Sequence, residues 1–287
     1  MAITKEEILA LEAKANELRH VTVDTVYSAG SGHLGGAMSV MDVLTILYYH
    51  FMKINRDDPN DPARDRLVLS KGHAGIGYVA VLADLGFIAK EDLKTFNLTG
   101  SKLGIHLDAN KVPGVDASTG SLGHGLPMAL GMALAATRLG EDWKTYCILG
   151  DGECDEGSVW EGAMGVANFN ATNLITFVDR NHAMIDGDTE DVMKLEPFVD
   201  KWTAFGFHTD VVNGHSFVEM DKAVSEALER KDKPTCIILD TVKGAGVDFA
   251  AGDYRWHYGA INEELRDKAH ASLDKYYEER IAAVKGE

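Results

Sequence analysis

Residues 150–187 read GDGECDEGSVWEGAMGVANFNATNLITFVDRNHAMIDG, and this segment gives the strongest indication of the fold class. A short apolar run, residues 145–149, leads into it, and a second, residues 174–179, lies near its end. A helical pattern that begins near Ser158 separates the two runs. The glycines of the GDG sequence allow the backbone to turn tightly and to approach a ligand closely. The stretch therefore predicts a strand, a helix and a second strand, with a ligand-binding turn after the first strand.

Three more β-rich runs occur elsewhere in the chain. They are residues 66–70, 209–212 and 236–242. Runs such as CIILDTV are nearly all apolar, which is typical of strands in a parallel sheet that helices cover on both faces. We therefore predict an α/β fold with a single domain over residues 1–287, built on a doubly wound, mostly parallel sheet. Such sheets bind ligands beyond the carboxyl ends of their strands.

Helical patterns fill much of the remaining sequence. They dominate the first hundred residues, as at residues 41–52, and include a charged amphipathic helix at the N-terminus. The region 120–139 is rich in small residues and is expected to form a buried helix. Residues 262–284 are expected to form an amphipathic helix that caps the domain, with Asn262 as its N-cap.

The composition is that of a globular protein and argues against several functional classes. Among 287 residues, 45 acidic and 28 basic side chains give a net charge of −17. This balance argues against a nucleic-acid or anionic-membrane surface, because both require clustered Lys and Arg. No stretch approaches the roughly 20 apolar residues of a membrane span, and the N-terminal helix lacks the apolar core of a signal peptide. We therefore expect a cytoplasmic protein.

The GDG turn and the end of the second strand together predict a metal site. Asp151 follows the first strand and Asn181 follows the second, so neighbouring parallel strands would bring them to one edge of the sheet. Mg²⁺ prefers about six oxygen ligands, often few of them from protein. The Asp151 carboxylate, the Asn181 amide oxygen and a backbone carbonyl near Ala183 would supply three, with diphosphate oxygens and water as the others. GDG alone is common and also suits a plain turn, but GDG followed by this second strand and Asn is much rarer.

Residues 150–187 resemble the thiamine diphosphate fingerprint, and the motif GDGE-x-x-EGSVWE within them is similar to that of the transketolase family. The resemblance covers almost the whole chain, and the other matching sequences occur in the family's order. They are SGHLGG at 31–36, RDRLVLSKGHA at 64–74, GIH at 104–106, TGSLGHG at 119–125, and TVKGAG and WHYGA within 241–260.

Four of the eleven histidines lie in the short sequences SGH, KGH, GIH and WHYG, and the resemblance gives these four roles. It implies that His33 and His257 face the substrate hydroxyl and the diphosphate side of the cofactor, that His73 lies by the cofactor, and that His106 lies by the donor's hydroxyls. Ketose cleavage requires a substrate hydroxyl to lose its proton, and imidazole can accept one at neutral pH. We therefore predict that His33, His106 and His257 are catalytic and contact substrate. Five others are expected to be ordinary surface or core residues: His20, His50, His208, His215 and His270.

The resemblance also implies that backbone loops hold the cofactor. Lys243 is similar to a cationic residue of the family near the diphosphate, although an exposed lysine at a strand end would look the same. Gly152 would offer its N–H to the diphosphate. The residues that resemble loops against the cofactor are Gly36, Gly120, Ser121 and Leu122.

A partner chain is a further implication of the resemblance. Family enzymes use a Glu on a separate pyrimidine-binding domain, and residues 1–287 contain no motif of that domain. We therefore expect the N-terminal subunit of a split transketolase, assembled as two copies of this chain and two of a C-terminal, pyrimidine-binding subunit. Glu156 and Glu161 resemble acidic residues at the family's subunit contact, and Glu156 could join a carboxylate network between two cofactor sites. Both would also suit a helix N-terminus, where the helix dipole favours a carboxylate.

The expected activity is that of a transferase in carbohydrate metabolism, such as the pentose phosphate reactions. It would move a two-carbon ketol unit from a ketose phosphate to an aldose acceptor, with thiamine diphosphate and Mg²⁺ as cofactors. His124 stands where many family members have Gln, and Leu34 stands where many have Pro. These two differences leave the identity of the sugar substrate open. Two alternatives within enzymes are 1-deoxyxylulose-phosphate synthase, which joins pyruvate with loss of CO₂, and a transketolase for an unusual sugar. A third alternative is a non-catalytic cofactor-binding or regulatory subunit.

Overall fold

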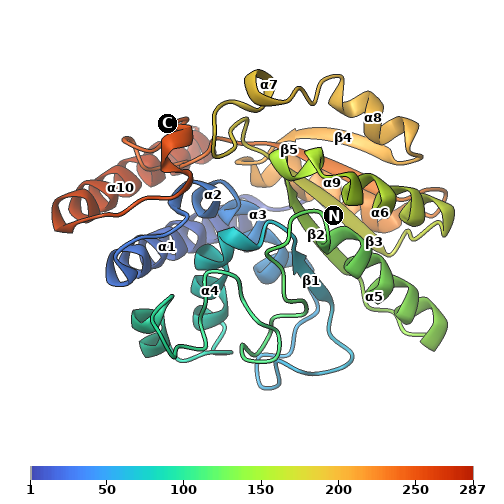
Figure 1. The fold of residues 1–287 in the computed structure, drawn as a ribbon, viewed down its shortest axis with the longest axis horizontal. Helices are drawn as coiled ribbons and strands as arrows, with labels where there is room; N and C mark the ends of the chain where they lie inside the picture. Colours follow the sequence, from blue (N-terminus) through green and yellow to red (C-terminus); the bar gives the residue numbers. More distant parts are fainter. Residues whose placement is uncertain (1, 287) are drawn as a thin grey trace.

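A five-stranded parallel sheet lies at the centre of the computed structural model, which describes residues 2–286 (Figure 1). Its strands are β1 (Arg66–Leu69), β2 (Thr145–Gly150), β3 (Leu174–Arg180), β4 (His208–Asn213) and β5 (Thr235–Asp240). Their order across the sheet is β1-β2-β3-β5-β4, and each neighbouring pair is parallel. The prediction of a mostly parallel sheet is therefore confirmed, and each predicted β-rich run forms a strand.

Helices cover both faces of this sheet, as a doubly wound fold requires. Every residue of β2 and β3 is buried, whereas the edge strand β4 alternates between partly buried and exposed residues. Ile148 and Phe177 face a core that includes residues of α1 (Lys5–Ala29), α3 (Met41–Ile46), α4 (Gly75–Asp84) and α9 (Phe217–Glu229). Leu149 and Val178 face a second core with α5 (Gly125–Leu139), α6 (Gly157–Asn168) and α8 (Phe198–Ala204). This two-sided burial explains why the strands are almost continuously apolar.

The chain ends pack together on one side of the sheet. The long helix α10 (Glu263–Lys285) lies along α1 (Figure 1). As predicted, Asn262 is its N-cap, and the side chain accepts a hydrogen bond from Leu265 N. The remaining helices are α2 (Leu34–Ser39) and α7 (Thr189–Val192), with 3-10 turns at Gly72–Ala74, Lys90–Thr95, Gly152–Asp155 and Tyr254–His257. Residues 2–286 contain no helix that is both long and apolar enough to span a membrane.

Three predicted element boundaries are wrong. The helix expected over 120–139 begins only at Gly125, because Gly120 and Gly123 have positive φ angles of 147° and 82°. It is also buried on one face only, since Leu139 is 70% exposed. The helix expected over 41–52 changes to a π-helical turn at Leu47–Phe51, and β5 ends at Asp240, two residues before the predicted run does.

Candidate functional site

A cavity of about 340 Å³ opens at the carboxyl ends of the central strands. Lys71 reaches it after β1, Asp151 after β2 and Asn181 after β3. Lys243 lines it from the segment that follows β5. Because the strands are parallel, their carboxyl ends meet at one edge of the sheet, where doubly wound folds bind ligands. The structure therefore brings the predicted strand-end residues together around one cavity.

Asp151 is the buried carboxylate of this cavity and is 2% exposed. The register of β2 and β3 pairs Gly150 with Asp179, so Asp151 lies next to the end of β3. Its Oδ1 atom accepts a hydrogen bond from Gly152 N (2.9 Å), and Oδ2 accepts one from His182 N (2.8 Å). Burial, and then the negative charge of Asp179, raise the pKa of Asp151 to about 6. A cation bound nearby would stabilise the charged form of this carboxylate.

Asn181 and Ala183, the other predicted metal ligands, lie beside Asp151. Asn181 Nδ2 donates to Asp179 Oδ2 (3.3 Å), and Asn181 Oδ1 accepts from Ala183 N (3.3 Å). The Ala183 carbonyl accepts a hydrogen bond from Lys243 Nζ at 2.6 Å. A cation at this carbonyl would therefore share it with the lysine ammonium group or displace that group. The three residues offer the oxygen donors that Mg²⁺ prefers and leave further positions for oxygens of a bound molecule, so they fit such a cation.

A buried ion pair beneath the cavity was not predicted from the sequence. Lys71 Nζ donates to Asp179 Oδ2 (2.5 Å) and to the Gly36 carbonyl (3.3 Å). Ser39 and Thr241 also donate to the Asp179 carboxylate, at 2.6 and 2.5 Å. Burial opposes the charge of Asp179, but the Lys71 ammonium and these hydrogen bonds outweigh it, and its pKa is lowered. The available signal was a lysine within SKGHA, a motif otherwise made of small and polar residues.

Glu153, a second residue that sequence reasoning missed, joins the loops around the cavity. Its Oε1 atom accepts hydrogen bonds from Gly123 N (2.8 Å) and Ser70 Oγ (2.5 Å), and Oε2 accepts one from Gly150 N (2.9 Å). The side chain is buried, and burial raises its pKa. Glu153 therefore fixes the turns after β1 and β2 to each other and to the loop before α5. The sequence offered GDGE as a signal but gave no sign of which acidic residue is buried.

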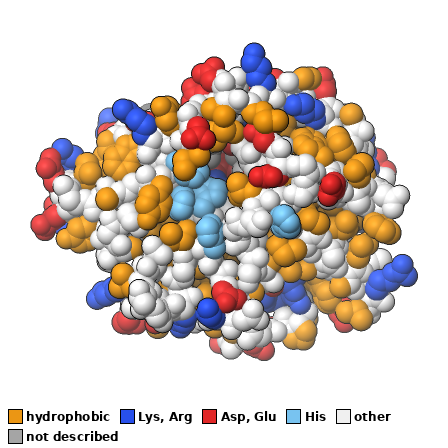
Figure 2. Space-filling model, in the orientation of Figure 1, with side chains coloured by type: hydrophobic (Ala, Val, Ile, Leu, Met, Phe, Trp, Pro, Cys, Tyr) orange, Lys and Arg blue, Asp and Glu red, His pale blue; other side chains and the backbone are white. Residues whose placement is uncertain are grey.

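Histidine side chains gather on one face of the molecule (Figure 2), and three of the predicted ones form a cluster. The ring centroid of His33 lies 5.2 Å from that of His73 and 5.3 Å from that of His257, and the last two are 4.9 Å apart. Burial, followed by the nearby His106, lowers the pKa of His33 to about 4. Burial, followed by the charge of Lys243, lowers the pKa of His257 to about 3. The pKa of His73 is also lowered, chiefly by burial, so all three rings are neutral at pH 7.

His106 is more exposed than these three rings and lies beside Gly120, yet it is close enough for its charge to act on His33. A Cβ atom at Gly120 would lie 2.8 Å from the His106 ring, and Gly120 has a φ of 147°. Both observations require glycine at this position. Burial lowers the pKa of His106 as well, so this ring is also neutral at pH 7.

Other predicted cofactor contacts are close to the cavity. Leu122 and Gly152 line it. The N–H of Gly152 donates to Asp151 Oδ1, so in this structure it serves the carboxylate that precedes it. Gly36 packs behind the cavity, where a Cβ atom would lie 3.3 Å from Lys71 Nζ.

The remaining predicted positions lie away from the cavity lining in the part of the chain that the structure describes. Ser121 is exposed, and so are Glu156 and Glu161 at the start of α6. Leu34 is fully buried in α2, and the exposed His124 has Nδ1 3.1 Å from the Leu122 carbonyl oxygen. These positions leave Ser121, Glu156 and Glu161 free to contact another chain.

The known proteins that this chain resembles are transketolases, both in sequence and in structure. The family described as "Transketolase, thiamine diphosphate binding domain" matches residues 11–276. The chain is 42% identical to a 6-deoxy-6-sulfo-D-fructose transketolase subunit of a Clostridium strain, covering 94% of this chain and 98% of that one. It is 39% identical to an apulose-4-phosphate transketolase subunit of Phocaeicola vulgatus, covering 92% of this chain and 93% of that one.

Solved structures show the same likeness. The transketolase of Pichia stipitis has a TM-score of 0.85 and 29% identity, over 97% of this chain and 45% of that one. That of Campylobacter jejuni has a TM-score of 0.84 and 31% identity, over 96% of this chain and 48% of that one. The chain thus spans less than half of these transketolases. It belongs to the transketolase family, as an N-terminal subunit that carries the thiamine diphosphate binding domain.

Proposed function

We propose that this chain is the diphosphate-binding subunit of a split transketolase. The enzyme would transfer a two-carbon ketol unit from a ketose phosphate to an aldose acceptor. The observation that carries the proposal is the convergence of Asp151, Asn181 and Ala183 in one cavity with neutral histidines around it. When bound, thiamine diphosphate supplies a carbon nucleophile that also serves as an electron sink.

The metal site of the proposal is Mg²⁺ held by the Asp151 carboxylate, the Asn181 amide oxygen and the Ala183 carbonyl. Within residues 2–286, no group of three or more His, Cys, Asp or Glu side chains could hold a metal ion by itself. A cation here would therefore depend on oxygens of the diphosphate, as Mg²⁺ commonly does. Burial and the nearby charge of Lys71 lower the pKa of Lys243 to about 8, so Lys243 is still mostly charged at pH 7 and attracts the diphosphate.

The histidines of the proposal handle protons of the substrate. Lys243 Nζ lies 3.1 Å from His257 Nδ1, and because an ammonium group only donates, Nδ1 accepts. Neutral His257 therefore carries its proton on Nε2 and would donate a hydrogen bond to a substrate oxygen. Neutral His33 and His106 have a lone pair free to accept a hydroxyl proton. His73 would lie against the cofactor, as would the Gly36 and Gly120–Leu122 loops.

A partner subunit is the next part of the proposal. The similar proteins from Clostridium and Phocaeicola are named as subunits and are covered almost completely by this chain. We propose that a C-terminal, pyrimidine-binding subunit completes the site and that two copies of each chain assemble. The exposed Glu156 and Glu161 would lie at that interface, with Glu156 near the second cofactor site.

The identity of the donor sugar can be determined by assaying a panel of candidate donors. Two similar proteins are named for 6-deoxy-6-sulfo-D-fructose and for apulose 4-phosphate. Both names describe an anionic sugar, so we propose an anionic ketose as the class of donor. A panel of ketose phosphates and a ketose sulfonate separates these substrates.

Titration calorimetry with thiamine diphosphate and Mg²⁺ tests the cofactor site, using the complex with the C-terminal subunit that co-purifies. Asp151→Asn should weaken binding at least about tenfold, because it removes the charged ligand of the cation. Asp240→Asn is the matched control, since Asp240 ends β5 at the same edge of the sheet but is exposed. Equal affinities for wild type and Asp151→Asn would overturn the proposed metal site.

A further inference from the structure

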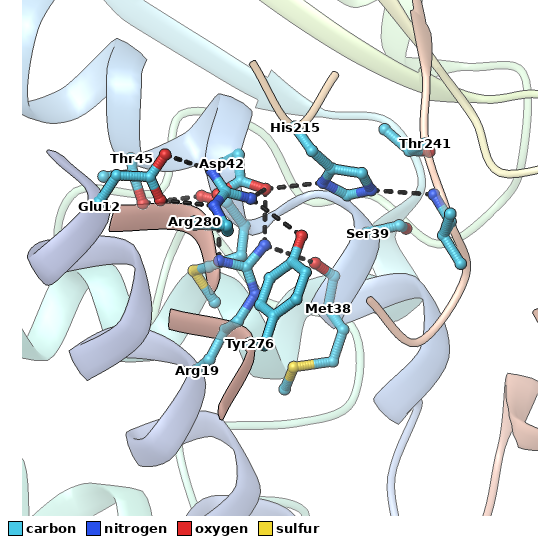
Figure 3. A network of polar contacts seen from close by, with 12 residues as sticks. Glu12, Arg19, Met38, Ser39, Asp42, Thr45, His215, Thr241, Tyr276 and Arg280 are labelled. Carbon is cyan, nitrogen blue, oxygen red and sulfur yellow. Dashed lines mark hydrogen bonds and ion pairs between the residues drawn. The ribbon is translucent and has the colours of Figure 1, made fainter. Parts of the chain in front are cut away.

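Asp42 lies at the centre of a buried cluster of charges behind the cavity (Figure 3). It is fully buried and accepts hydrogen bonds from Arg19 Nη2 (2.6 Å) and Arg280 Nη1 (3.2 Å). Arg280, in α10, also pairs with Glu12 of α1 at 2.5 Å. Burial opposes the charge of Asp42, but the two guanidinium groups outweigh it and hold its pKa well below the usual range. Asp42 is therefore a charged, firmly held acceptor that α1, α3 and α10 share.

His215 connects this cluster to the loop beyond β5 (Figure 3). His215 Nδ1 lies 2.7 Å from Asp42 Oδ2, and His215 Nε2 lies 2.9 Å from the backbone nitrogen of Val242. A backbone N–H can only donate, so Nε2 accepts and carries no proton. Nδ1 must then carry the proton and donate it to Asp42. One neutral tautomer of His215 therefore satisfies both contacts.

Val242 is the residue before Lys243 in the proposed diphosphate site. The residue is 44% exposed, so little apolar packing holds this point of the backbone. The flanking residues are fixed by hydrogen bonds from Thr241 N to the Arg180 carbonyl (3.1 Å) and from Gly244 N to the Gly35 carbonyl (2.9 Å). The contact from His215 fixes the backbone between those two points. It thus restricts the path from which the Lys243 side chain enters the cavity.

We infer that His215 is a positioning residue for Lys243: it fastens the loop at Val242 to the buried Asp42 cluster and thereby sets the affinity for a diphosphate that it does not touch. From the sequence alone, His215 was expected to be an ordinary surface or core histidine. The inference rests on the proposed function, because Lys243 is taken to face the diphosphate. The hydrogen bond between Val242 N and His215, called the tie below, can be tested without any cofactor.

Amide hydrogen exchange of the full chain without cofactor tests the tie itself. His215→Asn retains a donor that can reach Asp42 but is too short to reach Val242, whereas His215→Gln offers both a donor and an acceptor. Exchange of residues 241–245 should rise about three- to tenfold in His215→Asn and in His215→Ala, as the loss of one hydrogen bond predicts. It should stay near wild type in His215→Gln. His208→Ala is the matched control, because His208 also pairs with a carboxylate but lies at the opposite end of β4.

Cofactor affinity tests the consequence of the tie. With Mg²⁺ and the C-terminal subunit, His215→Asn should weaken thiamine diphosphate binding about three- to tenfold. The turnover number at saturating cofactor should stay within about twofold, because His215 does not contact substrate. His215→Gln and His208→Ala should bind like wild type.

The outcomes separate this inference from the proposed function. Variants that lower the melting temperature but leave both loop exchange and cofactor affinity unchanged would show that His215 is merely structural, which overturns the inference. Faster loop exchange with unchanged affinity would also overturn it, because the loop would not matter for the diphosphate. Absence of thiamine diphosphate binding by the wild-type complex would instead refute the proposed function.

Discussion

Buried carboxylates under the cavity differ in how completely they are paired. Asp179 has an ammonium group and two hydroxyl groups as donors, whereas Asp151 receives backbone N–H groups from Gly152 and His182. Burial raises the pKa of Asp151 to about 6, and the partners of Asp179 lower its pKa. Asp151 is therefore the carboxylate that gains most from a bound cation, and Asp179 is the one that holds the scaffold.

Glu153→Ala should destabilise the chain by about 2–4 kcal/mol, because Ser70, Gly123 and Gly150 would each lose a buried acceptor. Urea unfolding of the full chain without cofactor measures this change. Glu156→Ala is the control and should change the free energy of unfolding by less than about 0.5 kcal/mol, since Glu156 is exposed. Similar losses in both variants would contradict the role given to Glu153.

Single residues were predictable where a motif fixes both chemistry and strand position. The GDG turn and the Asn after the next strand placed Asp151 and Asn181 together, and the structure places them so. The segment GDGECDEG contains several acidic residues, and the sequence could not show that Glu153 is buried while Glu156 is exposed. That difference depends on loops that approach from distant parts of the chain, such as the one at Gly123.

Helix α5 depends on glycine at one position and tolerates a side chain at another. A Cβ atom at Gly125, its first residue, would lie 2.8 Å from the Cα atom of Ser70, so the two backbones must move apart. At Gly131, farther along the same helix, a Cβ atom would meet no atom of residues 2–286 within 4 Å apart from the adjacent residues and the nearby backbone of α5 itself. The contrast identifies where α5 meets the loop that follows β1.

Gly125→Ala should lower the free energy of unfolding by about 1–3 kcal/mol, because overpacking forces backbone shifts. Gly131→Ala should raise it by about 0.5–1 kcal/mol, because alanine favours a helix interior and stays free of clashes. Thermal and urea unfolding of the full chain measure both changes. A stabilising Gly125→Ala substitution would show that α5 does not pack on Ser70 as described.

The buried histidine cluster should make the free energy of unfolding depend on pH. The unfolded pKa of a histidine is about 6.5, and burial lowers the pKa of His33 to about 4. Between these values the unfolded chain binds a proton that the folded chain does not. The contribution of His33 to stability is therefore lost as the pH falls below about 6.5.

His33→Gln should remove this dependence. From pH 7 to pH 5 the wild type should lose about 1 kcal/mol more than His33→Gln, allowing for solvent screening at a partly exposed ring. The comparison between variants is needed because the raised pKa of Asp151 acts in the opposite direction. Urea unfolding at the two pH values measures the difference. Parallel losses in both proteins would mean that His33 titrates normally in the folded state.

The strands were the most predictable elements, because burial on both faces leaves a continuous apolar signal. Residues 145–149 and 174–179 agree with β2 and β3 to within one residue. The predicted run 236–242 extends too far because Thr241 and Val242 resemble strand residues. Thr241 N still donates to the Arg180 carbonyl of β3, but the Thr241 hydroxyl donates to Asp179 and Val242 N donates to His215, which lies outside the sheet. Contacts this distant cannot be read from local sequence.

At the scale of the whole molecule, this chain supplies the groups that are proposed to hold the diphosphate and the cation, and all of them lie at one cavity. The chain covers nearly all of the similar subunits but less than half of the solved transketolases. Its long helix α10 packs along α1, away from the exposed start of α6. We therefore expect the C-terminal subunit to contact Ser121, Glu156 and Glu161, which are exposed and lie outside the cavity lining but within eight residues of Leu122 or Glu153, which line it.

Reconstitution of ketol transfer from the two subunits tests whether this chain acts as one half of a split transketolase. The full chain, with Mg²⁺, thiamine diphosphate and the donor panel, should show no turnover alone and should gain turnover when the C-terminal subunit is added. Asp151→Asn in the same complex should be inactive, and pyruvate should yield no CO₂. Full turnover by the chain alone would contradict the need for a partner. A complex that binds the cofactor yet transfers no ketol unit from any donor would contradict the proposed reaction.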